Sequence, residues 1–147
     1  MFESILIPTD GSKTSEKAIE QGLALAKLSG GHVTFLHVLE NPLTTGYATP
    51  ESMPYAAQLY QDLRESGKNI LEAAVSTARS MGVTATSKLV EDADPVSAIT
   101  EASKEHDIIV MGTHGRRGFN RWMFGSVAEG ALRRADKPFL LIRSEDD

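Results

Sequence analysis

Residues 108–127, IIVMGTHGRRGFNRWMFGSV, contain the most informative pattern in the sequence. The stretch opens on a continuous apolar run, Ile108 to Met111, which is typical of a strand covered on both faces. A glycine-rich loop follows, and Gly125-Ser126 then begins a segment with helical spacing that extends to about Ala135. Because a buried strand that leads into a helix is half of a β-α-β unit, the stretch predicts a parallel sheet.

The same alternation of strand and helix extends over the whole chain. We expect the first helix to stop at Gly30-Gly31, the second to stop at Gly82 and the third to begin at Asp94-Pro95. The prediction is a single α/β domain over residues 1–147, with helices on both faces of a parallel sheet. The runs expected as strands are Ile5 to Ile7, Val33 to Leu39, Val83 to Val90, Ile108 to Met111 and Phe139 to Ile142.

The composition excludes several classes of protein. The 147 residues contain no cysteine, which excludes disulfide scaffolds, thiolate metal sites and cysteine nucleophiles. The longest apolar runs are far shorter than the about 20 residues that a membrane span needs. Fifteen Lys and Arg against twenty Asp and Glu give a net charge of −5, which argues against a dedicated nucleic-acid binder. With no basic segment of a secretory signal visible at the start, we expect a cytoplasmic protein with neither a membrane nor a nucleic-acid partner.

Two loops are candidate binding segments, since ligands of open parallel sheets bind beyond the carboxyl ends of the strands. The first, Pro8 to Ser12, places Asp10 at the end of a strand, although an acid or hydroxyl there could instead only cap the next helix. The second, Gly112 to Val127, combines glycines that allow close backbone approach with the free amides of a helix start, and it predicts an anion site. Ser126 and Glu129 also fit a capping box, which needs no ligand.

Several common catalytic motifs are missing from the sequence. There is no P-loop, no G-x-G-x-x-G after the first strand, no G-x-S-x-G nucleophile elbow and no H-E-x-x-H. His114, in the glycine loop, is the one histidine that is a candidate for ligand contact, and we expect His32 and His37 to be structural. The connection from Glu40 to Pro54 is either a plain linker or a flap near the site. The loop cations, either solvated or close to the bound anion, are Arg116, Arg117 and Arg121.

The second loop matches a known spacing, Gly-x2-Gly-x9-Gly-[Ser/Thr]. The first loop adds Ile7 to Ser12, and the chain closes on the run Pro138 to Ile142. With these motifs the chain resembles the universal stress protein family over nearly all of its length. The resemblance implies a five-stranded parallel sheet in the order 3-2-1-4-5, in a Rossmann-like fold of the adenine nucleotide alpha hydrolase type. The residues at the four spaced positions are Gly112, Gly115, Gly125 and Ser126.

The ATP-binding branch of that family keeps the glycine spacing, so the resemblance implies that this chain binds ATP. A Mg²⁺ ion held through the phosphates would be compatible with the same site. Met111 and Gly112 are implied to lie beside the ribose and the phosphates. The residues implied at the adenosine moiety are Pro8, Thr9, Asp10 and, through its backbone at the adenine edge, Val38. The residues implied at the phosphates are Gly115, Gly125, Ser126 and Val127.

Three functions fit these residues. The first is an ATP-binding regulatory or stress-response protein, in which the nucleotide is a signal. The second is a slow ATPase or phosphotransferase that uses the same site, although no general base is evident beyond His114 or Asp10. The third is an interaction module without a ligand. Nucleotide binding and turnover distinguish the three.

The last predicted strand, Phe139 to Ile142, is wholly apolar. In the order 3-2-1-4-5 it forms an edge, where it would expose unpaired backbone groups beside large apolar side chains. Pairing two such strands antiparallel across a twofold axis would remove both edges at once. We therefore expect a homodimer through this strand, as the family resemblance also implies.

Overall fold

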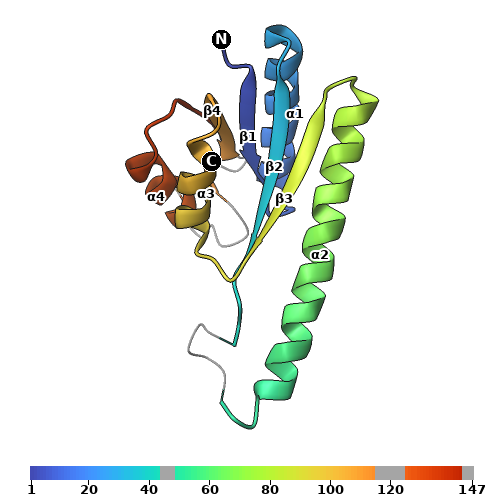
Figure 1. Ribbon diagram of the computed structural model, residues 1–147, viewed down its shortest axis with the longest axis vertical. Helices are drawn as coiled ribbons and strands as arrows, with labels where there is room; N and C mark the ends of the chain where they lie inside the picture. Colours follow the sequence, from blue (N-terminus) through green and yellow to red (C-terminus); the bar gives the residue numbers. More distant parts are fainter. Residues whose placement is uncertain (44–48, 115–124, 144–147) are drawn as a thin grey trace.

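The chain folds into a five-stranded parallel sheet in the order β3-β2-β1-β4-β5, with helices on both faces (Figure 1). A computed structural model describes residues 1–43, 49–114 and 125–143. The observed order confirms the expected sheet. In chain order the elements are β1 (Ser4–Pro8), α1 (Lys13–Ser29), β2 (His32–Leu39), α2 (Met53–Ser80), β3 (Ala85–Glu91), α3 (Pro95–Ser103), β4 (Ile108–Gly112), α4 (Ser126–Arg134) and β5 (Phe139–Ile142).

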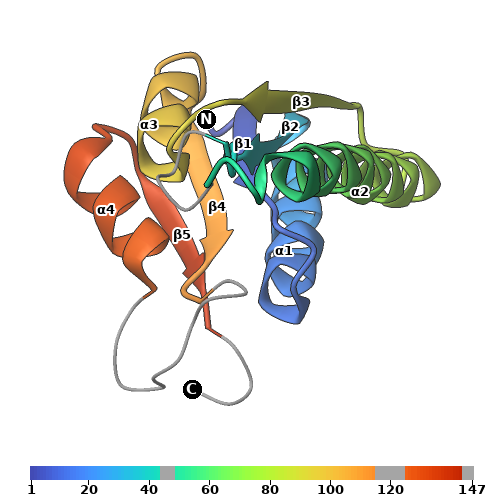
Figure 2. The ribbon, with the colours of Figure 1, turned by 90° about the horizontal axis from the view of Figure 1, so that it is seen from below.

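Alternate residues of the central strands pack on opposite faces of the sheet, which divides the core in two. On one face Ile5, Ile7 and Phe35 pack against α1 and α2. On the other face Leu6 and Leu36 pack against α3 and α4. Figure 2 shows the two pairs of helices on either side of the sheet. Burial on both faces explains why the central strands read as continuous apolar runs.

Local signals mark the helix ends where the sequence predicts them. Gly30 ends α1 in the left-handed conformation, with φ of 69°, which favours glycine. Gly82, with φ of 73°, follows the end of α2. The side chain of Asp94 accepts a hydrogen bond from the Ser97 amide at 3.0 Å, so Asp94 caps α3.

Two predicted boundaries are wrong by two residues. Strand β3 starts at Ala85 rather than Val83, because the Val83 amide donates to Ala78 O and so belongs to the turn after α2. Helix α2 starts at Met53, so Pro54 lies in its first turn instead of ending the connection from Glu40. Proline is tolerated there because the first amides of a helix have no intrahelical partner. The 28-residue α2 continues past the carboxyl ends of the strands (Figure 1).

Candidate functional site

A cleft of about 780 Å³ lies at the carboxyl ends of the central strands. The chain winds from β1 to β2 on one side and reaches β4 on the other, so the winding direction reverses between β1 and β4. This is the position at which open α/β sheets bind ligands. The walls of the cleft come from the loops after β1, β2 and β4, from the starts of α1, α3 and α4, and from α2.

The loop after β1 is held in a tight turn that points Asp10 toward the cleft. Asp10 Oδ1 accepts from the Ser12 amide at 2.9 Å, and Gly11 has φ of 81°, which favours glycine. Ser12 caps α1, since its hydroxyl accepts from the Ser15 amide at 3.2 Å. The cap therefore uses Ser12, while Asp10 shapes the turn and lines the cleft.

The second wall joins the end of β4 to the start of α4. The Gly125 amide donates to Thr113 O at 2.7 Å, and the Thr113 amide donates to Ile142 O at 2.9 Å. Gly125 is the N-cap residue and makes no side-chain cap bond, so Ser126 is the first helical residue. The capping box predicted from Ser126 and Glu129 is therefore wrong: the extended backbone of Gly125, with ψ of 149°, moves the helix start by one residue.

Gly112 allows α1 to pack closely against the end of β4. A Cβ on Gly112 would lie 2.5 Å from Thr14 Cγ2 and 3.2 Å from Thr14 Cβ. Thr14 is buried in the first turn of α1. The glycine thus brings the amino end of α1 and the β4 backbone to the same wall of the cleft.

Three helices begin at the cleft. Ser12 at α1, Pro95 at α3 and Gly125 at α4 all line it. Each helix carries partial positive charge at its amino end. Ser12 and Asp94 each cap one amide of α1 and α3, whereas α4 begins at Gly125 with no side-chain cap bond. Three such ends around one cleft favour an anionic ligand.

Comparison with known proteins agrees with this geometry. The model of the universal stress protein family matches residues 1–143. The chain belongs to this family. Universal stress protein MJ0531 of Methanocaldococcus jannaschii is 31% identical over 145 residues, which cover 97% of this chain and 83% of that protein.

Solved structures of the family share the fold. The MJ0577 protein of Methanocaldococcus jannaschii superposes with a TM-score of 0.84 at 27% identity, over 100% of this chain and 99% of that one. A universal stress protein of Archaeoglobus fulgidus in complex with dAMP superposes with a TM-score of 0.67 at 25% identity, over 97% and 99% of the two chains.

In this universal stress protein, each expected site residue that lies among the described residues lines the cleft. Gly115 lies outside the described residues, as do the arginines at 116, 117 and 121. His114 also lines the cleft, and its Nδ1 lies 3.2 Å from Thr113 Oγ1. The expected site residues that line the cleft are Pro8, Thr9, Asp10, Val38, Met111, Gly112, Gly125, Ser126 and Val127.

The sequence did not indicate an apolar wall on the other side of the cleft. Leu59 and Leu63 reach it from α2, four residues apart and therefore on one face of the helix. Glu40 and Pro42, in the connection before α2, also line the cleft. His37, expected to be structural, donates from Nδ1 to Thr9 O at 2.8 Å and lines the cleft as well.

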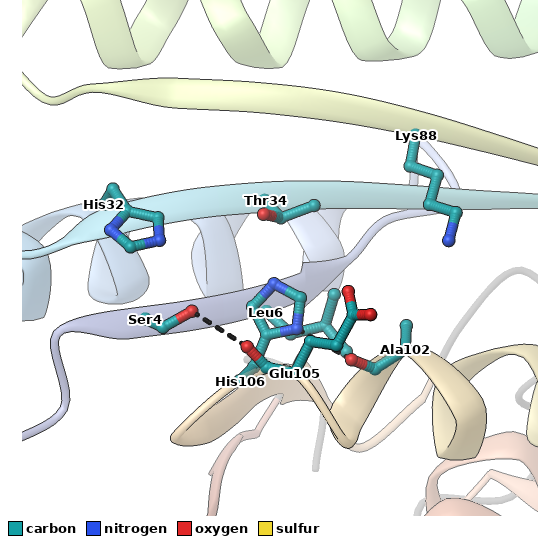
Figure 3. Close-up of a pocket in the computed structure, with 8 residues that line it drawn as sticks. All are labelled: Ser4, Leu6, His32, Thr34, Lys88, Ala102, Glu105 and His106. Carbon is teal, nitrogen blue, oxygen red and sulfur yellow. Dashed lines mark hydrogen bonds between the residues drawn. The ribbon is translucent and has the colours of Figure 1, made fainter.

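A second, smaller hollow of about 260 Å³ lies at the amino ends of β1 and β2 (Figure 3). Two of its lining side chains bond to nearby backbone: His106 Nδ1 donates to Ala102 O at 2.7 Å, and Ser4 Oγ donates to Glu105 O at 3.4 Å. Across the parts of the chain that the structure describes, no group of three or more His, Asp or Glu could hold a metal ion. No helix among those same residues is long and apolar enough to cross a membrane.

Proposed function

We propose that this universal stress protein binds ATP in the cleft at the carboxyl ends of its strands, as a regulatory or stress-response protein. The observation that carries the proposal is the meeting of three helix amino ends around a glycine backbone at the point where the sheet winding reverses. The dAMP complex of the Archaeoglobus fulgidus relative supports an adenine nucleotide as the ligand class. We propose one nucleotide-binding domain over residues 1–147.

The proposed nucleoside end of the cleft lies between β1 and β2. Thr9 donates to Leu36 O at 2.8 Å, so the peptide groups of Leu36 face β1. Peptide groups alternate in direction along a strand, and those of Val38 therefore face the same side, just beyond Pro8, where β1 has ended. We assign the nucleobase edge to Val38 and the remaining nucleoside contacts to Pro8, Thr9 and Asp10.

The proposed phosphate end lies between β4 and α4. The amides at the start of α4 come from Gly125, Ser126 and Val127, and all three residues line the cleft. Met111 and Gly112 lie between this end and the nucleoside end, and we assign them to the ribose and phosphates. Backbone amides that meet a phosphate form charge-assisted hydrogen bonds, each contributing about 1.5–3 kcal/mol. We expect any Mg²⁺ to enter with the phosphates, and we propose a cytoplasmic location.

Calorimetric titration with ATP tests the proposal. We expect saturable binding at one site per chain, and ATP at about 100 times its dissociation constant should stabilise the fold by about 2.7 kcal/mol. Mass spectrometry of protein purified without added ligand should reveal an adenine nucleotide. An unchanged melting temperature in saturating ATP would contradict the site assignment. Release of phosphate at a steady rate would favour the alternative function, a slow ATPase or phosphotransferase.

We further propose a homodimer through β5, the edge strand beside β4. Pro138 O and Ile142 O accept from Ile109 and Thr113 of the β4 side, so the peptide groups of Phe139 and Leu141 face the open edge. Leu140 on the same strand is 38% exposed. A second copy pairing antiparallel would satisfy the outward amides and cover the exposed leucine.

Replacing Leu141 with proline should dissociate the dimer, because it removes an outward amide and leaves the β4-facing amides in place. Leu141→Ala, which keeps that amide, is the matched control and should remain dimeric. Sedimentation measures the outcome against the 15.9 kDa chain mass. A natural protein that sediments as a monomer at tens of micromolar contradicts the proposal.

A further inference from the structure

We propose that His37 is a positioning residue for the nucleotide site: its imidazole holds the Thr9 carbonyl, which sets the loop carrying Asp10 and leaves the Val38 peptide groups open to the nucleobase. This inference rests on the proposed function and adds a residue that neither the glycine motif nor the acid after β1 includes. His37 lies in β2, between two residues whose backbone faces β1.

Both peptide groups of Thr9 are held by consecutive residues of β2. The Thr9 amide donates to Leu36 O at 2.8 Å. The Thr9 carbonyl lies 2.8 Å from His37 Nδ1. Because a carbonyl can only accept, Nδ1 must carry the hydrogen, and the tautomer of the ring is set by this bond. These two hydrogen bonds from β2 form a clamp on Thr9. Thr9 is 5% exposed and directly precedes Asp10, so the clamp fixes the start of the turn that directs the Asp10 carboxylate.

The imidazole takes the place of a backbone donor. In a parallel ladder that continued past Pro8, the Val38 amide would donate to Thr9 O, since the Leu36 peptide groups already face β1. With the His37 ring on that carbonyl, β1 stops pairing at this point, and Val38 presents its amide and carbonyl to the cleft. An amide and a carbonyl two bonds apart along a strand edge match the adjacent acceptor and donor of an adenine edge.

Helix α2 holds the ring in this orientation. A Cβ on Gly67 would lie 2.7 Å from His37 Cδ2 and 3.1 Å from Nε2. The imidazole therefore occupies the space that a larger residue at position 67 would fill, with its Cδ2 and Nε2 atoms toward the helix. Close packing of this kind leaves the ring one orientation, in which Nδ1 faces the Thr9 carbonyl.

Loss of the clamp should weaken ATP binding without changing any residue assigned above to the nucleotide. A loop that spends only part of its time in the binding geometry lowers the apparent affinity by that fraction. For His37→Leu, which keeps an apolar side chain of similar reach, we expect an about tenfold loss of ATP affinity, equivalent to about 1.4 kcal/mol. His37→Asn places an amide nitrogen near the position of Nδ1 and should restore most of that affinity.

His106 supplies a matched control at the other end of the sheet. Its Nδ1 donates to Ala102 O at 2.7 Å, and the residue is 9% exposed, so His106→Leu removes a buried bond of the same kind. Calorimetry with ATP and hydrogen exchange of amides 9–12 in the ligand-free protein measure both pairs of variants. We expect weaker ATP binding and faster exchange in His37→Leu, recovery in His37→Asn, and natural values of both in His106→Leu.

Three results would overturn the inference: natural ATP affinity in His37→Leu, equal losses in His37→Leu and His106→Leu, or no recovery in His37→Asn. If His37→Leu does not fold, Gly67→Ala gives the same test with the imidazole retained, since the added methyl displaces the ring. If the natural protein binds no ATP, the proposed function fails, and the exchange of amides 9–12 still reports whether His37 holds the loop.

Discussion

The two ends of the sheet carry two hollows of opposite character. At the carboxyl end, three helices begin around the cleft with the partial positive charge of their amino ends, and α4 begins there without a side-chain cap. At the amino end, Ala102 near the end of α3 lines the hollow, together with His106 just beyond it, and a helix end carries partial negative charge. The direction of the helices, set by the parallel connections, thus makes one end suited to phosphate and the other unsuited to it.

Titratable side chains do not explain which end of the sheet favours an anionic ligand. The smaller hollow is lined by His32, Lys88, Glu105 and His106. The larger cleft holds the acids Asp10 and Glu40 among its lining residues, yet its backbone favours an anion. Its volume of about 780 Å³ falls in the usual range for ligand sites, about 300–1,000 Å³, and the 260 Å³ hollow falls below it. The comparison predicts that changes at the carboxyl end alter ligand affinity and that changes at the amino end alter stability.

The largest expected effect follows from adding a methyl group at the carboxyl end. In Gly112→Ala the new Cβ would lie 2.5 Å from Thr14 Cγ2 and 3.2 Å from Thr14 Cβ, so Thr14 must shift, either through its side chain or with the first turn of α1. We expect ATP affinity to fall at least tenfold, since the wall that α1 and β4 share is displaced, together with a lower melting temperature. Calorimetry and thermal denaturation measure the two quantities.

Gly31→Ala supplies the corresponding change at the amino end. A Cβ there would lie 2.4 Å from Glu3 O and 2.8 Å from Glu3 Cα, both backbone atoms that cannot rotate away. The melting temperature should fall, while ATP affinity per folded molecule should stay at the natural value. If Gly31→Ala weakens ATP binding as much as Gly112→Ala does, the division between the two ends is wrong.

A smaller effect is expected for Ser126→Ala. The N-cap of α4 is Gly125, and no side-chain cap bond exists there, so the substitution should change stability by less than about 0.5 kcal/mol. A hydroxyl bonded to phosphate contributes more, and we expect an about tenfold loss of ATP affinity. Unchanged affinity in this variant would show that Ser126 does not meet the phosphates.

Ser126 also shows where the sequence stops being sufficient. Asp94-Pro95 predicted the start of α3 correctly, because a cap and a first-turn proline act within one turn. The capping box at Ser126 has equally good spacing, but Gly125 is the N-cap residue, and its amide is held by a hydrogen bond to Thr113 O in the preceding loop. The spacing of the glycines thus identified one wall of the cleft, but it did not identify the residue that caps α4.

Contacts between distant segments account for the residues that were missed. His37 reaches Thr9 across 28 positions of sequence, and a histidine inside a strand carries no signal of that bond. Leu59 and Leu63 have the spacing of a buried helix face, and they line the cleft because α2 extends beyond the carboxyl ends of the strands that it covers. Strand and helix periods predict which face is buried, whereas the length of one element relative to its neighbours decides what that face covers.

The smallest expected effect belongs to Asp107, at the amino end just before β4. Its Oδ2 accepts from the Ser4 amide at 3.0 Å and the Glu3 amide at 3.1 Å, which ties the start of β1 to the start of β4. The hydrogen bond from the Ser4 backbone is the main cause of an Asp107 pKa below its usual 3.8. A carboxyl whose pKa is lower in the folded state stabilises the fold above the unfolded value and loses that contribution as the pH falls through the folded value.

Asp107→Asn removes the titrating group and tests this dependence. Above about pH 5 the carboxylate is ionised in both folded and unfolded chains, and the natural protein should melt at a higher temperature than the variant. As the pH falls below 3.8, the Asp107 carboxyl of the natural protein takes up its proton and the two melting temperatures should converge. A difference that stays constant with pH would mean that the charge of Asp107 adds nothing to the two amide bonds. Asp107 directly precedes β4 at the amino end of the sheet, whereas Gly112 ends β4 at the cleft. ATP affinity at neutral pH should therefore be the same in both proteins. A loss of affinity in Asp107→Asn would show that changes at the amino end of the sheet affect the cleft.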